Sequence, residues 1–579
     1  MLARRLALLA ACLALPAGLR ADGAEELLVR AGEPARPGGR LVVPMRSEPK
    51  SFNPVSATDG ASRDVYGRMH ANLIRINRET QRTEPALARS FEVSPDGRRL
   101  TLELRRGLRF SDGHPFDADD VVFSWQAYLD ERNHSPHRDL LIVGGKPIAA
   151  RKLATHTVAF DFAVPYAVGE RIFDGIAMLP RHLLERAQRD GRLADAWSLG
   201  SAAAEIAGLG PFRLRSLEPG ERVVLERNPH YWKADGAGTR LPYLDELHFV
   251  SVPSEDAQVI RFQSGDADVI SRMSAENFAA LSPDAAARGL NLRDLGPGLE
   301  YSFLFFSLGE PPAPNPAQAR RQAWFRNVAF RRAVSAALDR QGMARLAFGG
   351  RAAPLGGHVT PGNKLWLNAA LAAPKRALES ARRLLEQAGF AWSADGALQD
   401  AGGERVQFSI LTNSSNAARV RMAAIAQEDL RGLGMQVHVV TLETRAVLDR
   451  VLRTRDYDAC ILGLGGGDAD PNVEMNVWLS NGPSHLWNPQ QAQPATPWEA
   501  EIDRLMRAQI AAVDPALRKR LYDRVQQIVA DELPMLPLVA PNILVGAKAS
   551  LLNLRPAILD HYLLWNADEL AWRSPGAAR

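Results

Sequence analysis

A strand, helix and second strand follow one another near residue 420, and this unit sets the fold class. Val406, Phe408 and Ile410 alternate with polar residues, as in a strand with one buried face. The segment 420–433 carries apolar residues at helical spacing and ends at Gly434, and residues 435–440 then predict another strand. Two strands joined through a helix are neighbours in a parallel pair. We therefore predict an α/β chain with more than one sheet.

The length requires several domains, and the charge excludes some partners. A chain of 579 residues is expected to form roughly two to four domains. Lys plus Arg is 70 and Asp plus Glu is 66, and residues 1–21 hold three of the arginines and no acid, which leaves 67 against 66. Such a balance gives no dense basic face for nucleic acid. We predict a globular protein that binds no nucleic acid.

The first 21 residues resemble a secretory signal. Arg4 and Arg5 precede an apolar run, 6–19, that is too short to span a bilayer. The alternative is the start of a buried helix. Leu9 to Cys12 resembles a lipobox, in which Cys12 is acylated, while cleavage after Ala17 or Ala21 is the alternative. No other run of 18 apolar residues occurs, so we predict a periplasmic or extracytoplasmic protein, with Cys12 as a candidate membrane anchor.

Other segments predict single elements. We expect strands at 41–43, 101–104 and 457–464, a helix opening at Asp117, and one continuous helix over 327–346. Residues 22–39 predict a loose leader. Cys460 lies in an apolar run, which indicates a buried, inert thiol.

A series of short motifs carries a family resemblance. In chain order these are Arg46–Pro49 with Phe52–Pro54, Glu84–Ala88, Leu104–Gly113, Ala118–Ser124, Gly210–Phe212, Leu225–Trp232, Arg332–Val334, Leu338–Arg340 and Asp531–Leu538. Their order and spacing over residues 40–570 resemble the family 5 extracytoplasmic solute-binding proteins of ABC importers, which include oligopeptide-, dipeptide- and nickel-binding components.

This resemblance implies a two-lobed fold with an additional inserted domain and a hinge. Domain I would combine residues 40–75, 206–300 and 530–579; domain II would be 76–205 and domain III 301–529. The solute would enter between domains I and III, and the lobes would close over it. The partners implied are a small solute, with peptide as the default class, and an ABC permease in the inner membrane; the chain itself would be a monomer.

The sequence contains few of the motifs that mark a catalytic site. HExxH, GxSxG and GxxxxGK[ST] are absent from the sequence, and its 12 histidines are scattered. A secreted hydrolase with two catalytic carboxylates is the remote alternative. We predict no enzyme and no cofactor.

The stretch Gly465-Gly466-Gly467-Asp468-Ala469-Asp470-Pro471 lies where peptide-binding relatives carry an amine-binding loop. The resemblance places an Asp four residues before the Pro, where this chain has Gly467; Asp468 is one place late. The spacing also fails for a dinucleotide loop, and a calcium loop would need Gly at Val473 and Glu at Leu479. We predict no metal here. Either the glycines open space beside the ligand, or Asp468 replaces the missing acid.

Further candidate ligand-binding residues lie on both sides of the implied cleft. Asn476, Trp478, His485 and Trp487 share a loop-rich stretch; stacking on a ligand and packing of the loop are equal alternatives. By family position Thr58, Asp59 and Gly60 would lie near the ligand backbone, and His137 where some peptide binders place a cleft aromatic. The predicted function is solute capture for an ABC importer, for a peptide or alternatively an oligosaccharide, opine or metal chelate.

Overall fold

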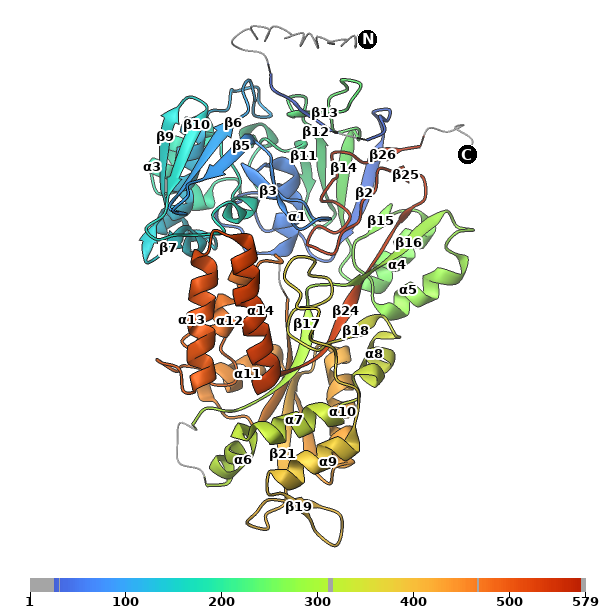
Figure 1. The fold of residues 1–579 in the computed structure, drawn as a ribbon. Coiled ribbons are helices and arrows are strands. Elements are labelled where there is room, and N and C mark those ends of the chain that lie inside the picture. Colours follow the sequence, from blue (N-terminus) through green and yellow to red (C-terminus); the bar gives the residue numbers. More distant parts are fainter. Residues whose placement is uncertain (1–24, 31, 311–315, 466–467, 574–579) are drawn as a thin grey trace, which may run out of the picture.

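Two four-stranded sheets and one eight-stranded sheet organise the chain (Figure 1). The computed structural model describes residues 25–30, 32–310, 316–465 and 468–573. The predicted signal segment, Cys12 and Gly467 lie outside these residues.

The first sheet is antiparallel, in the order β5 (Ala88–Val93), β6 (Arg99–Leu104), β10 (Thr157–Asp161) and β9 (Ala149–Ala154). Helix α2 (Ala118–Leu129) packs against β9 and β10. As predicted, α2 opens at Asp117, whose carboxylate accepts from the amide of Asp119, so that the first turn of the helix is capped.

The second sheet has the order β11 (Phe212–Glu218), β12 (Arg222–Arg227), β14 (Glu246–Ser251) and β2 (Arg40–Met45). The pair β14 and β2 is parallel. Helix α1 (Gly60–Met69) contacts β11 and follows β2 through a loop. It carries several residues of the site described below.

The third sheet runs β15 (Val269–Ile270), β24 (Met535–Lys548), β17 (Tyr301–Phe306), β23 (Ala459–Leu464), β21 (Gln407–Asn413) and β22 (Gln436–Leu442). Strands β16 (Leu290–Pro297) and β18 (Ala352–Pro354) also pair with β24. Strands β21 and β22 are parallel and are connected by α10 (Ala417–Arg431), which confirms the predicted unit.

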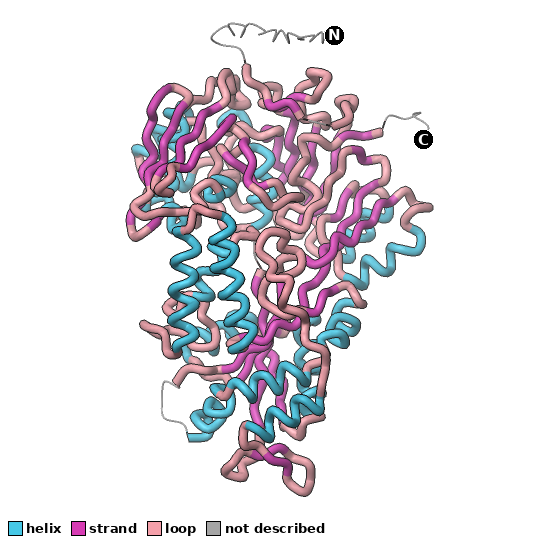
Figure 2. Tube along the Cα trace, in the orientation of Figure 1, coloured by secondary structure: helices cyan, strands magenta, loops and turns pink. Residues whose placement is uncertain are grey.

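The hydrophobic cores divide the chain into two lobes. One cluster joins residues 41–269 to residues 543–571, and a smaller one packs residues 259–290 against Leu544. We call residues 25–297 with 543–573 the upper lobe. Two other clusters cover the two faces of the large sheet in the lower lobe, residues 301–542. Helices α7 (Val328–Ala337), α9 (Leu378–Gln387) and α10 cover one face, and α13 (Pro497–Ala511) and α14 (Pro515–Glu532) cover the other (Figures 1 and 2). Strand β24 runs through both lobes.

Two local predictions were wrong. The single helix expected over 327–346 is two helices, α7 (Val328–Ala337) and α8 (Arg340–Phe348). The side chain of Asp339 accepts from the amide of Gly342 and so begins a new helix. The leader is not wholly loose, because Leu28 and Val29 pair with Lys233 and Ala234 of the upper lobe.

The division of the upper lobe into domains I and II stays a prediction, since one continuous hydrophobic cluster packs both segments.

In the part of the chain that the structure describes, no helix is both long and apolar enough to cross a membrane.

Candidate functional site

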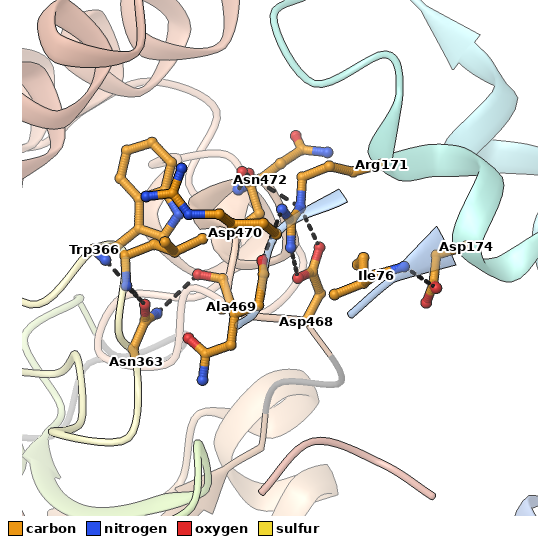
Figure 3. A network of polar contacts seen from close by, with 12 residues as sticks. Ile76, Arg171, Asp174, Asn363, Trp366, Asp468, Ala469, Asp470 and Asn472 are labelled. Atoms are coloured by element: carbon orange, nitrogen blue, oxygen red, sulfur yellow. Dashed lines mark hydrogen bonds and ion pairs between the residues drawn. The ribbon is translucent and has the colours of Figure 1, made fainter. Parts of the chain in front are cut away.

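The end of β23 brings Asp468 to the boundary between the lobes (Figure 3). Its carboxylate accepts two hydrogen bonds from the guanidinium of Arg171, one from Nε at 2.9 Å and one from Nη2. Arg171 begins η3 (Arg171–Gly175), a short helix of the upper lobe. Both side chains are largely buried, at 18% exposure for Asp468 and 10% for Arg171. A bidentate ion pair therefore joins the two lobes.

Asp470 fixes the same loop inside the lower lobe. Its two carboxylate oxygens accept from Nη1 and Nη2 of Arg518 on α14, each at 2.7 Å. Arg518 also lies over the ring of Trp366, at 4.7 Å from the centroid. Asp470 Oδ2 is 3.8 Å from Arg171 Nε. Burial disfavours the charge of Arg171, but its hydrogen bonds to Asp468 and the charges of both aspartates outweigh burial and raise its pKa.

Further polar contacts cross between the lobes beside this pair. Gln81 donates to the carbonyl of Gly362 at 2.7 Å and accepts from the amide of Lys364 at 2.8 Å. Asn472 donates to the hydroxyl of Tyr166 at 3.0 Å. The segments 79–81 and 166–171 of the upper lobe thus meet the lower lobe at several hydrogen-bonded points.

Two cavities in the upper lobe are both lined by residues of α1. One, of about 370 Å³, is lined by Gly60, Ala61 and Asp64 among others. The other, of about 290 Å³, is lined by Tyr66, Gly67 and Arg68 among others. Residues of the C-terminal segment 560–564 line both cavities.

Of the four residues predicted on the upper lobe, Gly60 and His137 line these cavities, and Thr58 and Asp59 directly precede Gly60. Asp59 caps α1 by accepting from the amide of Ser62 at 2.8 Å, and Gly60 lines the larger cavity. The carbonyl of Thr58 accepts from Arg63 at 3.0 Å. His137 lines the smaller cavity, where burial lowers its pKa and favours the neutral ring.

The residues predicted after the glycine loop lie in the core of the lower lobe. Trp478 and Trp487 are each 1% exposed and His485 is fully buried. Trp478 donates to Glu474 at 2.8 Å, while Trp487 and His485 both contact Glu499. Asn476 is exposed. In this conformation the tryptophans and His485 occupy packing positions and line none of the cavities described above.

Sequence reasoning missed Arg171, Arg518 and Glu474. Glu474 follows the loop in the chain, three residues after Pro471, and its carboxylate accepts from the hydroxyl of Tyr522 at 2.8 Å. Burial raises the pKa of Glu474, although its hydrogen bonds lower it. Arg171 is 297 residues from Asp468, and no local pattern marks it. Among the described residues no group of three or more His, Cys, Asp or Glu side chains could hold a metal ion.

Known proteins share this architecture. The chain is 26% identical over 493 residues to a probable ABC transporter-binding protein of Deinococcus radiodurans, covering 82% of each chain. It is 25% identical to the oligopeptide-binding protein AppA of Bacillus subtilis, covering 88% of each. The crystal structure of NikA from Brucella suis in complex with Fe(III)-EDTA matches with a TM-score of 0.76 at 21% identity, covering 92% of this chain and 100% of that one.

The family model of the bacterial extracellular solute-binding proteins, family 5, matches residues 82–485, which is more than half of the chain. The order of the motifs, the two-lobed fold and this match agree. The chain belongs to family 5 of the bacterial extracellular solute-binding proteins.

Proposed function

We propose that this protein captures a solute between its two lobes outside the cytoplasmic membrane and delivers it to an ABC permease. The observation that carries the proposal is the ion pair of Arg171 with Asp468, because it joins the lobes through side chains that solvent could reach if they separated. Peptide is the first solute class to test, since a relative over most of the chain is an oligopeptide-binding protein.

Capture rests on closure and opening of the lobes and needs no catalytic group. Closing removes water from the site, which strengthens each polar contact with the solute. The contacts of Gln81 with Gly362 and Lys364 would form in the same movement. The chain would act as a monomer, exported by its first 21 residues, with Cys12 as a candidate lipid anchor.

A non-peptide solute is the second candidate, and one observation favours it. The acid that could replace the missing amine clamp, Asp468, is already paired with Arg171. An ammonium group buried there would have to displace this arginine or stay unpaired, which is unfavourable. An oligosaccharide, opine or metal chelate could bind without a free carboxylate at Asp468.

Purification from the native bacterium tests the proposal. Mass spectrometry of the solute released on unfolding should identify one small molecule in near-stoichiometric amount, and calorimetry should show that the stripped protein binds it again. A protein that carries no solute and that is recovered from the cytosol with residues 1–11 intact would contradict the proposal.

A further inference from the structure

The smaller cavity beside α1 concentrates positive charge. It is lined by segments of the upper lobe alone, which come from α1, β3 (Ile74–Ile76), η3, residues 231–233 and residues 560–568. Five of its lining residues are cations and three are acids. The cations are Arg63, Arg68, Arg75, Arg78 and Lys233, and the acids are Asp174, Asp560 and Asp568.

Each of the other buried or half-buried cations around this cavity has a carboxylate partner. Arg75 pairs with Glu84 at 2.5 Å, and Arg78 with Asp174 at 2.8 Å. Lys233 pairs with Asp568 at 2.8 Å. The fold therefore neutralises these groups locally, as buried charges require.

Arg68 is different. Its side chain is 5% exposed, and its one hydrogen bond is to the carbonyl of Gly67 at 3.3 Å. Its Nε and Nη2 have no acceptor, and no carboxylate of the described residues lies within ion-pair distance of its guanidinium. Burial lowers its pKa to about 10, although the charges of Asp64 and Asp568 act on it from beyond ion-pair distance and raise the pKa, so the group is still charged at neutral pH. An unpaired buried charge is strongly unfavourable.

A second buried arginine shows how this fold satisfies such a group elsewhere. Arg340 is 3% exposed and has no acidic partner among the residues that the structure describes. Its guanidinium donates to the carbonyls of Pro537 and Ser335, both at 2.7 Å, and to the hydroxyl of Ser335 at 2.8 Å. Arg68 has no comparable set of acceptors and, unlike Arg340, lines a cavity.

We infer that this cavity binds an oxyanion group of the transported solute, and that this group is the direct ion-pair partner that Arg68 lacks. The inference rests on the proposed function and narrows it to anionic solutes, whose oxyanion is a carboxylate or a phosphate. Arg63, an exposed side chain that also lines the cavity, adds a second cation. Aromatic residues complete the wall and suit an organic body: Tyr66, Tyr231, Trp232 and Trp565.

Helix η3 connects this cavity to the boundary between the lobes. Its first residue, Arg171, pairs with Asp468, and its last two, Asp174 and Gly175, line the cavity. A solute with its anionic group at Arg68 would therefore lie one short helix away from the ion pair that joins the lobes. The upper lobe would hold the anionic end of the solute, and the lower lobe would then close over the rest of the solute.

The test uses the full mature chain stripped of solute, with glutarate, neutral glutaramide and inorganic phosphate as probes in calorimetry. We expect glutarate or phosphate to bind and glutaramide not to bind. Arg68→Met should weaken binding of the bound anion by about 30-fold or more, because it removes the charged partner. Arg383→Met, which removes an exposed arginine on α9 of the lower lobe, should leave binding unchanged.

Binding of glutarate alone identifies the oxyanion as a carboxylate, and binding of phosphate alone identifies it as a phosphate. No binding of either anion, or equal binding by Arg68→Met and Arg383→Met, would overturn the inference. If Arg68→Met does not fold, Arg68→Lys serves instead: it keeps the charge but loses the planar guanidinium, and binding should weaken without loss of the fold. The proposed function fails by a different result, in which the wild-type chain carries no solute and is recovered from the cytosol with residues 1–11 intact.

Discussion

Arg171 Nε lies 2.9 Å from Asp468 Oδ2, and this contact joins a short helix of the upper lobe to the loop after β23 in the lower lobe. Asp470, two residues on, accepts hydrogen bonds from a different arginine, Arg518, within its own lobe. The two aspartates of one loop thus differ in their hydrogen bonds: Asp468 is bonded to Arg171 across the lobes, whereas Asp470 is bonded to Arg518 within its own lobe and lies 3.8 Å from Arg171.

Asp468→Asn should open the lobes without unfolding either one. A charged hydrogen bond contributes about 1.5–3 kcal/mol, so its loss should lower the ratio of closed to open molecules by about tenfold or more. Small-angle scattering at a solute concentration that leaves the wild type partly closed should give a larger radius of gyration for the variant than for the wild type. Arg171→Gln should have the same effect, and the double variant should add little, because both changes remove one interaction.

An unchanged scattering curve for Asp468→Asn would show that other contacts hold the lobes. A sharp loss of affinity confined to Asp468→Asn, together with preference for peptides that have a free amino terminus, would instead assign Asp468 to an amine clamp.

Asp470→Asn should destabilise the lower lobe. The change leaves Arg518 buried and unpaired at 6% exposure, which is expected to lower the free energy of unfolding by about 3–5 kcal/mol. Urea denaturation followed by tryptophan fluorescence measures this difference, since several tryptophans lie in the lower lobe. Equal stability of Asp470→Asn and Asp468→Asn would contradict the different effects expected of the two changes.

Trp478→Ala and Trp487→Ala should act on stability. Both side chains are 1% exposed in one hydrophobic cluster, so each truncation should lower the free energy of unfolding by about 3–5 kcal/mol. The folded fraction should keep the affinity of the wild type for the co-purified solute. A loss of affinity at unchanged stability would place the rings against the ligand and contradict their packing role.

Glu474 should make the protein less stable as the pH rises. Burial raises its pKa in the folded state above 4.5, its value in the unfolded chain. In the interval between the two values the folded state binds more protons than the unfolded state, so stability falls with rising pH. Glu474→Gln keeps an acceptor for Trp478 and Tyr522 and should remove this fall.

Denaturation of wild type and Glu474→Gln from pH 4 to pH 8 tests this sign. The difference in the free energy of unfolding should grow in favour of the variant above pH 4.5 and then level off. The exposed Glu379→Gln is the control and should follow the wild type. A variant that loses stability relative to the wild type as the pH rises would contradict the argument.

Local patterns predicted the elements but not the contacts between lobes. The unit of β21, α10 and β22 was predictable because alternation, helical spacing and a glycine lie within 40 residues. The break at Asp339 was missed, because a capping carboxylate ended a pattern that looked continuous. The partner of Asp468 could not be found, since folding alone brings Arg171 across 297 residues. The burial of Trp478 and Trp487 likewise depends on α13, which follows them in the chain.

The movement of the lobes is the central claim, and scattering tests it most directly. The wild-type chain is stripped of solute by unfolding and refolding, and its radius of gyration is measured with and without the co-purified solute at saturation. We predict a smaller radius with the solute than without it. The same radius in both samples, with calorimetry showing that the solute is bound, would contradict capture by closure of the lobes.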